Sequence, residues 1–282
     1  MKIITQAKTI QELSQKFRRE GKTIGFVPTM GYLHDGHRSL LKACRRHNDI
    51  SILSIFVNPT QFGPQEDFQS YPRDKKKDVL LAKKENVDII FYPSEKMMYP
   101  GRYLTYIHVE KITATLCGAS RPGHFRGVAT VVGKLLNIVQ PHRIYLGQKD
   151  AQQCVVIRQM VKDLNFPVQV RVLPTFREKD GLALSSRNAY LTAEERQEAP
   201  ALYQALKMAR EEIRRGETDS SRLIKNMKAV LNNRCRHGII EYIACVEAET
   251  LEPVKIIQGS IVLALAVRLG KARLIDNIFV RA

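Results

Sequence analysis

The chain contains 282 residues, with 45 Lys+Arg against 28 Asp+Glu for a formal net charge of +17, and 44% of its residues are hydrophobic. This apolar fraction is typical of a folded protein, and no apolar run approaches the about 20 residues that a transmembrane helix needs. The five cysteines form no C-x-x-C pair and residues 1–13 lack the apolar core of a signal peptide, so we expect a soluble, cytoplasmic protein with reduced, buried thiols.

The first part of the chain predicts alternating strands and helices. Short apolar runs predict strands at residues 23–27, 50–57, 87–92, 143–146 and 168–173. Amphipathic stretches predict helices at residues 39–46, with Ser39 as its N-cap, and at 73–85, 128–139 and 150–164. Strands separated by single helices are typical of a parallel sheet, whose ligands bind beyond the carboxyl ends of the strands. The loops after the strands are therefore the first places to search for a site.

After residue 176 the pattern changes to long helices followed by strands. Helices are predicted at residues 193–215 and 220–236, the first opened by a capping box of Thr192 and Glu195. Strands are predicted at residues 239–246, 260–267 and 273–280. We therefore expect an α/β protein with a Rossmann-like parallel-sheet domain over residues 1–176 and a smaller α+β domain over residues 177–282.

The loop after the first predicted strand carries two histidines. Residues 28–37 read Pro-Thr-Met-Gly-Tyr-Leu-His-Asp-Gly-His and lie between a strand and a helix. His34 and His37 can share one face at the helix N-terminus, where free N–H groups and the helix dipole favour phosphate binding. Gly36 allows a ligand to approach the backbone closely. Two imidazoles there suit phosphoryl chemistry. A metal site is the alternative, although it would have only two protein ligands, and two unrelated loop histidines are the simplest explanation.

A second motif, Leu-Ser-Ser-Arg-Asn at residues 184–188, follows the last strand of the first domain. Hydroxyl and guanidinium groups suit the oxygens of a triphosphate, although the motif alone is equally typical of a surface turn. Together the two motifs resemble the paired signatures of the nucleotidylyltransferase and class I aminoacyl-tRNA synthetase superfamily.

Further segments narrow the resemblance to the pantoate–β-alanine ligase (pantothenate synthetase) family. They are Val-Pro-Thr-Met-Gly at 27–31, Phe-Val-Asn-Pro-Thr-Gln-Phe at 56–62, Tyr-Pro-Arg at 71–73, Met-Tyr-Pro at 98–100, Arg-Pro-Gly-His-Phe-Arg-Gly-Val at 121–128, Gly-Gln-Lys-Asp at 147–150 and Asp-Gly-Leu-Ala at 180–183. The resemblance implies an enzyme of pantothenate biosynthesis that condenses (R)-pantoate with β-alanine through pantoyl adenylate. ATP is cleaved to AMP and pyrophosphate, Mg²⁺ bridges the phosphates, the smaller domain acts as a lid, and the enzyme is a homodimer.

The resemblance also implies roles for individual residues. His37 and His34 would be catalytic, Gln61 would contact pantoate and β-alanine, Gln153 would contact pantoate, and Asp78 would bind Mg²⁺. Contacts to ATP are implied at Met30, Gly31, Tyr32, Leu33, His34, Asp35, Gly36, His37, Gly147, Gln148, Lys149, Asp150, Phe176, Leu184, Ser185, Ser186 and Arg187. Asn58 is a further candidate contact. The chain departs from the usual family pattern at Gln148 and at Cys117, where Glu is more common in both cases.

Two rival functions remain at this level. A nucleotidylyltransferase that keeps the nucleotide on its product would explain the histidines and serines equally well, whereas Gln61, Gln153 and residues 121–128 favour the ligase. A nucleic-acid-binding protein would explain the charge, of which +13 (27 basic, 14 acidic) lies before residue 177 and +4 (18 basic, 14 acidic) after it. The lysines at residues 75–77 are as well explained by an exposed helix face. We expect small-molecule substrates and no nucleic-acid partner.

Overall fold

The computed structural model describes residues 1–64 and 66–281, which pack as two compact units. Unit 1 comprises Met1–Glu110, Arg121–Gly147 and Val156–Pro174. Unit 2 comprises Lys111–Ser120, Gln148–Val155 and the chain from Thr175 onward. The chain passes from unit 1 to unit 2 for the last time between Pro174 and Thr175, close to the domain boundary predicted after residue 176. Two earlier segments, 111–120 and 148–155, also belong to unit 2. The division into functional domains stays a prediction.

Unit 1 is built on a six-stranded parallel sheet in the order β1-β4-β3-β2-β5-β6. The strands are β1 (Lys2–Ile4), β2 (Ile24–Thr29), β3 (Ile50–Ile55), β4 (Ile89–Phe91), β5 (Arg143–Gly147) and β6 (Gln169–Leu173). Five of them match the predicted apolar runs. β1 is not among the predicted elements, because it has only three residues and they are largely exposed.

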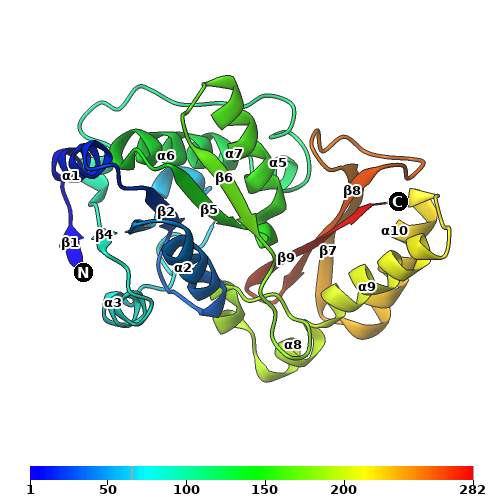
Figure 1. Ribbon diagram of the computed structural model, residues 1–282. Coiled ribbons are helices and arrows are strands. Elements are labelled where there is room, and N and C mark those ends of the chain that lie inside the picture. Colours follow the sequence, from blue (N-terminus) through cyan, green and yellow to red (C-terminus); the bar gives the residue numbers. More distant parts are fainter. Residues whose placement is uncertain (65, 282) are drawn as a thin grey trace. The chain divides into compact units, whose positions relative to one another are not determined.

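Helices cover both faces of this sheet (Figure 1). α1 (Ala7–Arg19) and α6 (His124–Val139) pack together on one face, and α2 (Asp35–His47) and α3 (Lys75–Lys84) pack on the other. α7 (Ala151–Asp163) follows β5, and the short helices α4 (Glu95–Met98) and α5 (Cys117–Ser120) lie in the long connection between β4 and α6. Apolar side chains of α2 pack against the sheet in a core that includes Val27, Leu40, Leu41, Leu53 and Tyr145.

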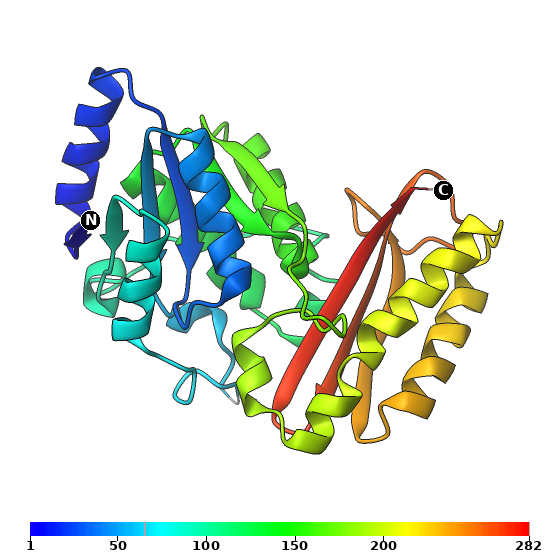
Figure 2. The same ribbon diagram turned by 60° about the horizontal axis from the view of Figure 1, so that its bottom comes forward.

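Unit 2 contains a three-stranded antiparallel sheet of β7 (Gly238–Glu247), β8 (Ser260–Leu269) and β9 (Ala272–Arg281). α9 (Ala201–Arg214) and α10 (Ser220–Arg234) lie side by side along it (Figure 2). The single helix predicted at residues 193–215 is wrong, because Pro200 separates α8 (Ala193–Glu198) from α9 and cannot donate a helical hydrogen bond. The capping box of Thr192 and Glu195 is confirmed. The predicted α/β class with a second α+β unit is also confirmed.

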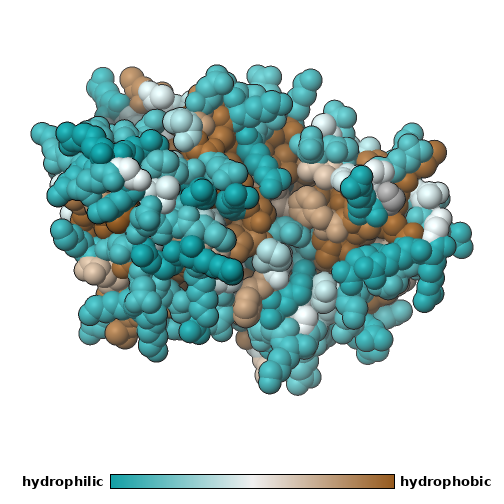
Figure 3. All heavy atoms as spheres, viewed as in Figure 1, coloured by the Kyte–Doolittle hydropathy of each residue, from teal (hydrophilic) through white to brown (hydrophobic). Residues whose placement is uncertain are grey.

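Hydrophilic side chains cover most of the face shown in Figure 3. The lysines of α3 at residues 75–77, 83 and 84 are exposed, as expected for a solvent-facing helix. All five cysteines are buried and free, which confirms the prediction of buried thiols. Within residues 1–64 and 66–281, none of the helices combines the length and the apolar character that crossing a membrane requires.

Candidate active site

His34 and His37 lie at the N-terminus of α2, directly after β2. The Nδ1 atom of His34 accepts a hydrogen bond from the backbone N–H of Gly36 at 3.2 Å, and Nδ1 of His37 accepts from the N–H of His34 at 3.3 Å. The helix therefore begins four residues before the predicted start at Ser39, and His34 rather than Ser39 is its N-cap. Ser39 instead donates to the carbonyl of Gly36 at 2.7 Å.

This capping arrangement also fixes which ring nitrogen carries the proton. Because Nδ1 of each ring accepts a hydrogen bond, a neutral imidazole must carry its proton on Nε2. The two ring centroids are 4.1 Å apart, so the two Nε2–H donors come from adjacent rings. A pair of donors at the N-terminus of a 13-residue helix is suited to stabilising a phosphoryl group.

Asp78 of α3 anchors the loop that precedes these histidines. Its carboxylate accepts hydrogen bonds from the N–H groups of Tyr32 at 3.0 Å and Leu33 at 2.7 Å, and the side chain is 1% exposed. Gly31 has a φ of +86°, and a Cβ atom there would lie 2.9 Å from Oδ2 of Asp78. Burial raises the pKa of Asp78, and the two backbone hydrogen bonds oppose this rise. The carboxylate and the glycine together set the path of the loop.

These contacts give Asp78 a structural role, and its predicted role as a Mg²⁺ ligand stays a prediction. Both carboxylate oxygens already accept backbone hydrogen bonds, and the described residues contain no group of three His, Cys, Asp or Glu side chains that could hold a metal ion. Mg²⁺ prefers six oxygen ligands and often takes most of them from water and substrate phosphates. The geometry supports an anchor at Asp78 and does not supply a protein cage for the ion.

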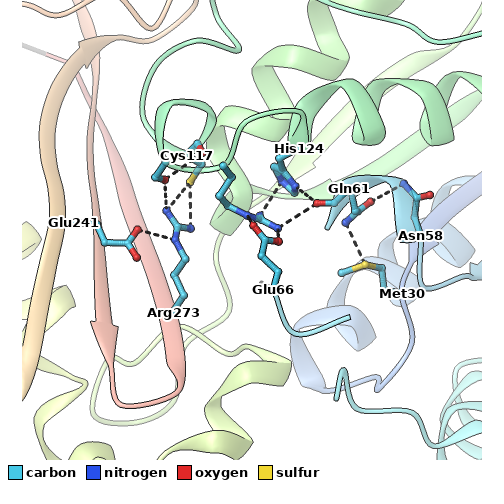
Figure 4. Close-up of polar contacts among 10 residues, drawn as sticks. Met30, Asn58, Gln61, Glu66, Cys117, His124, Glu241 and Arg273 are labelled. Atoms are coloured by element: carbon cyan, nitrogen blue, oxygen red, sulfur yellow. Dashed lines mark hydrogen bonds and ion pairs between the residues drawn. The ribbon is translucent and has the colours of Figure 1, made fainter. Parts of the chain in front are cut away.

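Gln61 ends the short 3₁₀ helix Pro59–Gln61 that follows β3, and its amide is held from both sides (Figure 4). Oε1 accepts from Nδ2 of Asn58 at 3.1 Å, and Nε2 lies 3.2 Å from the sulfur of Met30. Met30 belongs to the predicted ATP segment, so the structure brings the Gln61 amide beside that segment. Because Nε2 has a second hydrogen and Oε1 a second lone pair, the Gln61 amide can still bond a carboxylate or hydroxyl of a substrate.

Asn58 positions Gln61 rather than serving as a substrate contact. It is 1% exposed and also donates to the carbonyl of Gly127 at 3.2 Å. Its Oδ1 accepts from the hydroxyls of Thr60 at 3.0 Å and Tyr99 at 2.7 Å. All of its hydrogen-bonding capacity is thus used inside unit 1. Burial raises the pKa of Tyr99 to about 12, so this hydroxyl stays a donor at neutral pH.

The main chain of Gln61 is held by two residues of the 121–128 segment, for which the sequence indicated no individual role. Nδ1 of His124 lies 2.8 Å from the carbonyl oxygen of Gln61, and Nη2 of Arg121 donates to the same oxygen at 3.3 Å (Figure 4). Arg121 also pairs with Glu66, with Nε donating at 2.7 Å. Burial acts to raise the pKa of Glu66, but the hydrogen bonds and charge of Arg121 outweigh it and hold the pKa below its usual value.

The remaining predicted site residues, apart from Gly147 at the end of β5, belong to unit 2. Gln148, Lys149 and Asp150 form a 3₁₀ turn before α7. On α7, Gln152 is buried and structural: it accepts from the N–H of Cys117 at 3.0 Å and donates to two carbonyls of the 111–120 segment. Its neighbour Gln153 is half-buried, and its contact with pantoate stays a prediction.

The Ser-Ser-Arg loop is ordered by its own hydrogen bonds. Ser185 caps the 3₁₀ helix Ser186–Tyr190 by accepting from the N–H of Arg187 at 3.3 Å. Leu184 donates its N–H to the carbonyl of Phe176 at 3.0 Å, which pairs two of the predicted ATP segments of unit 2. Phe176 is 43% exposed, and its contact with ATP stays a prediction.

The departure from the family pattern at Cys117 is accommodated within unit 2. The Cys117 sulfur lies 3.2 Å from the Tyr242 hydroxyl and 3.6 Å from Nη1 of Arg273. Arg273 forms its ion pair with Glu241 at 2.8 Å (Figure 4). The guanidinium of Arg273 thus pairs with a carboxylate and also lies against the Cys117 sulfur.

Comparison with known proteins identifies the family. The pattern of the family described as pantoate-beta-alanine ligase matches residues 2–279. The chain belongs to this family. Pantothenate synthetases of Caldicellulosiruptor bescii and Thermosipho melanesiensis are 53% and 54% identical to it, each over at least 99% of both chains. The predicted family and ligase activity are confirmed.

Solved structures of the ligase family agree with the fold. A pantothenate synthetase of Thermus thermophilus superposes with a TM-score of 0.93 at 43% identity, covering 99% of each chain. The Francisella tularensis pantoate-beta-alanine ligase, solved in complex with beta-gamma ATP and beta-alanine, has a TM-score of 0.79 at 38% identity over 99% of this chain and 97% of that one. The roles of individual residues stay predictions and are developed next.

Proposed function

We propose that the chain joins (R)-pantoate to β-alanine, using ATP and releasing AMP and pyrophosphate. The observation that carries the proposal is the family match over residues 2–279. The pair of imidazoles at the N-terminus of α2 supports it independently, because the pair suits phosphoryl transfer. The complex of the Francisella tularensis relative supports ATP and β-alanine as substrates.

In the first step a pantoate carboxylate oxygen attacks the α-phosphorus of ATP. A bond forms between that oxygen and the phosphorus, and the bond from the α-phosphorus to the bridging oxygen of the pyrophosphate breaks. Charge develops on the phosphoryl oxygens and on the leaving pyrophosphate, so fixed donors accelerate the step. We assign His34 and His37 to the transferring phosphoryl group, and Lys149, Ser185, Ser186 and Arg187 to the phosphates.

In the second step the β-alanine amine attacks the carbonyl carbon of pantoyl adenylate and AMP leaves. The bond from the carbonyl carbon to the phosphate oxygen of AMP breaks as the amide bond forms, and the amine proton passes to the departing AMP or to water. Gln61 and Gln153 are assigned to the pantoate moiety, with Gln61 also beside β-alanine. Adenylates hydrolyse readily, so water must be excluded, and closure of residues 177–282 as a lid would serve this purpose.

Three further features belong to the same proposal. Mg²⁺, bound together with ATP, would neutralise charge on the leaving pyrophosphate. The enzyme acts in the cytoplasm. It works as a homodimer, as the family resemblance implies, and analytical ultracentrifugation would test this with the purified chain.

The test of the proposed function is AMP formation with single substrates omitted. We expect AMP to appear with ATP, pantoate and β-alanine together, and pyrophosphate–ATP exchange to need pantoate but not β-alanine. A stable adenylylated product in place of AMP would identify a nucleotidylyltransferase instead. Salt-dependent binding of RNA or DNA at physiological ionic strength, without AMP formation, would favour a nucleic-acid-binding protein.

Gln61→Ala is expected to weaken pantoate binding while leaving the ATP site intact. The substitution removes the Nε2 donor and leaves Nδ2 of Asn58 without one of its acceptors, so we expect the KM for pantoate to rise about 10-fold or more. Steady-state kinetics with each substrate varied in turn will show this. Gln15→Ala, at an exposed position of α1, is the matched control. An unchanged pantoate KM would remove Gln61 from the site.

A further inference from the structure

Asn277 of β9 binds the backbone of the Gln148–Asp150 turn. Its side chain is 3% exposed, and Nδ2 donates to two consecutive carbonyls, those of Gln148 at 3.0 Å and Lys149 at 2.8 Å. A single amide nitrogen has two hydrogens, and both are used here. Two consecutive peptide groups are thereby held in one orientation, and Lys149 lies between them.

The Asn277 amide satisfies its donors but not its acceptor. Oδ1 is buried and has no hydrogen-bond partner among the described residues. A buried unpaired oxygen costs free energy, because it loses its hydrogen bonds to water and gains none in return. An apolar side chain would avoid this cost but would leave the carbonyls of Gln148 and Lys149 without this donor. The amide is thus explained by what its nitrogen holds.

The strand that carries Asn277 is itself fixed in two ways. Within the sheet, Asn277 pairs with Ala264 of β8. The preceding residue, Asp276, is 3% exposed and receives both guanidinium nitrogens of Arg177, with Nη1 at 2.6 Å and Nη2 at 2.8 Å. Burial raises the pKa of Asp276, and the guanidinium opposes this rise. A bidentate pair of this kind leaves β9 little freedom to shift.

Arg177 also contacts the residues that precede the predicted ATP segment at residues 184–187. Nη1 donates to the carbonyl of Gly181 at 3.1 Å, and the guanidinium lies 3.7 Å from the centroid of the Tyr203 ring. Gly181 has a φ of +96°, and a Cβ atom there would lie 2.5 Å from Tyr203. Asn277 therefore holds the Gln148–Asp150 turn, and Asp276, through Arg177, supports the segment around Gly181 that precedes Ser185.

From these contacts we infer that Asn277 is a positioning residue for adenylate formation, acting through the backbone that carries Lys149. The inference rests on the proposed function, in which Lys149 meets the phosphates of ATP. Lys149 is half-buried and its Nζ lies 3.5 Å from Oδ1 of Asp150. A turn that loses its backbone anchor would let the ammonium group move away from the phosphates, and displacements of about 1 Å can cost about 100-fold in rate.

The test uses Asn277→Asp, which keeps the shape of the side chain but replaces the donor by an oxygen facing two carbonyls. We expect kcat/KM for ATP in pantoate-dependent pyrophosphate–ATP exchange to fall about 10- to 100-fold. Asn277→Ala removes the donor without adding a buried charge and should show a loss of the same kind. Asn233→Asp makes the same chemical change at an exposed position of α10 and should leave the exchange unchanged.

A double-mutant cycle with Lys149→Met separates positioning from general damage. If Asn277 acts through Lys149, adding Asn277→Ala to the Lys149→Met chain should change the exchange rate by no more than about twofold. An equal loss in both backgrounds, or wild-type exchange in Asn277→Ala, would overturn the inference. Failure of the wild-type chain to form AMP would instead overturn the proposed function, so the two failures are distinguishable.

Discussion

Replacing His37 by alanine is expected to slow pantoate-dependent pyrophosphate–ATP exchange about 100- to 1000-fold. Because Nδ1 of His37 accepts a hydrogen bond in the capping box, its Nε2–H is the donor available to the phosphoryl group. Loss of one fixed donor to a phosphoryl or oxyanion transition state lowers the rate by about this factor. The reduction should be in kcat, because the charge on the transferring group grows only as the transition state forms.

Folding should change little in the same variant. His37 accepts the N–H of His34 in the capping box, and loss of such a cap costs about 1 kcal/mol in the free energy of unfolding. His47→Ala, at the exposed C-terminal end of the same helix, is the matched control and should retain wild-type exchange. Wild-type turnover in His37→Ala would show that this imidazole does not take part in the chemistry.

The parts of the fold that the sequence predicted are those whose signal is local. The strands of the parallel sheet are short apolar runs, because both faces of the sheet are covered by helices. The histidine motif was also visible, since spacing alone places His34 and His37 on one helix turn. The start of α2 was misplaced because histidine is an unusual N-cap, and Ser39 matched the commoner pattern.

Long-range contacts explain what the sequence could not predict. The family resemblance implied a role for Asp78, but its partners are the backbone N–H groups of Tyr32 and Leu33, 46 and 45 positions earlier. Asn277 reaches carbonyls 129 and 128 positions away. Because backbone groups are present at every residue, such partners leave no trace in the side-chain sequence. The supporting residues of this site were therefore visible only in three dimensions.

Cys117 illustrates another limit of prediction from the sequence. The sequence identified it as a departure from the family pattern, but not how the change is tolerated. In the structure Arg273 pairs with Glu241 and its guanidinium lies against the Cys117 sulfur. Both residues are strand residues of one sheet and are distant from Cys117 in sequence, so these contacts could not be predicted from the residues around Cys117.

Asp78→Asn is expected to lower kcat about 10- to 100-fold without raising the Mg²⁺ concentration needed for half-maximal activity. An asparagine of the same shape can accept from only one of the two N–H groups, of Tyr32 or of Leu33, and its NH₂ group faces the other. The loop that leads to His34 and His37 then loses one of its two anchors, and catalytic groups displaced by about 1 Å lose rate on this scale. An Mg²⁺ ligand would behave differently, because its loss raises the metal requirement directly.

The pH dependence of stability gives this prediction a second, independent readout. Burial raises the pKa of Asp78 in the folded chain, so the folded state holds this proton to higher pH than the unfolded state does. Stability from this group is thus greatest below the unfolded pKa and declines as the pH rises through the folded pKa. Asparagine does not ionise, so urea titrations from about pH 4 to about pH 7 should show the variant gaining relative to the wild type. Asp163→Asn, at an exposed position of α7, should show no such gain. If Asp78→Asn kept full activity, Asp78 would have no role in positioning the histidine loop. If only the Mg²⁺ requirement rose, Asp78 would be a metal ligand rather than the anchor of that loop.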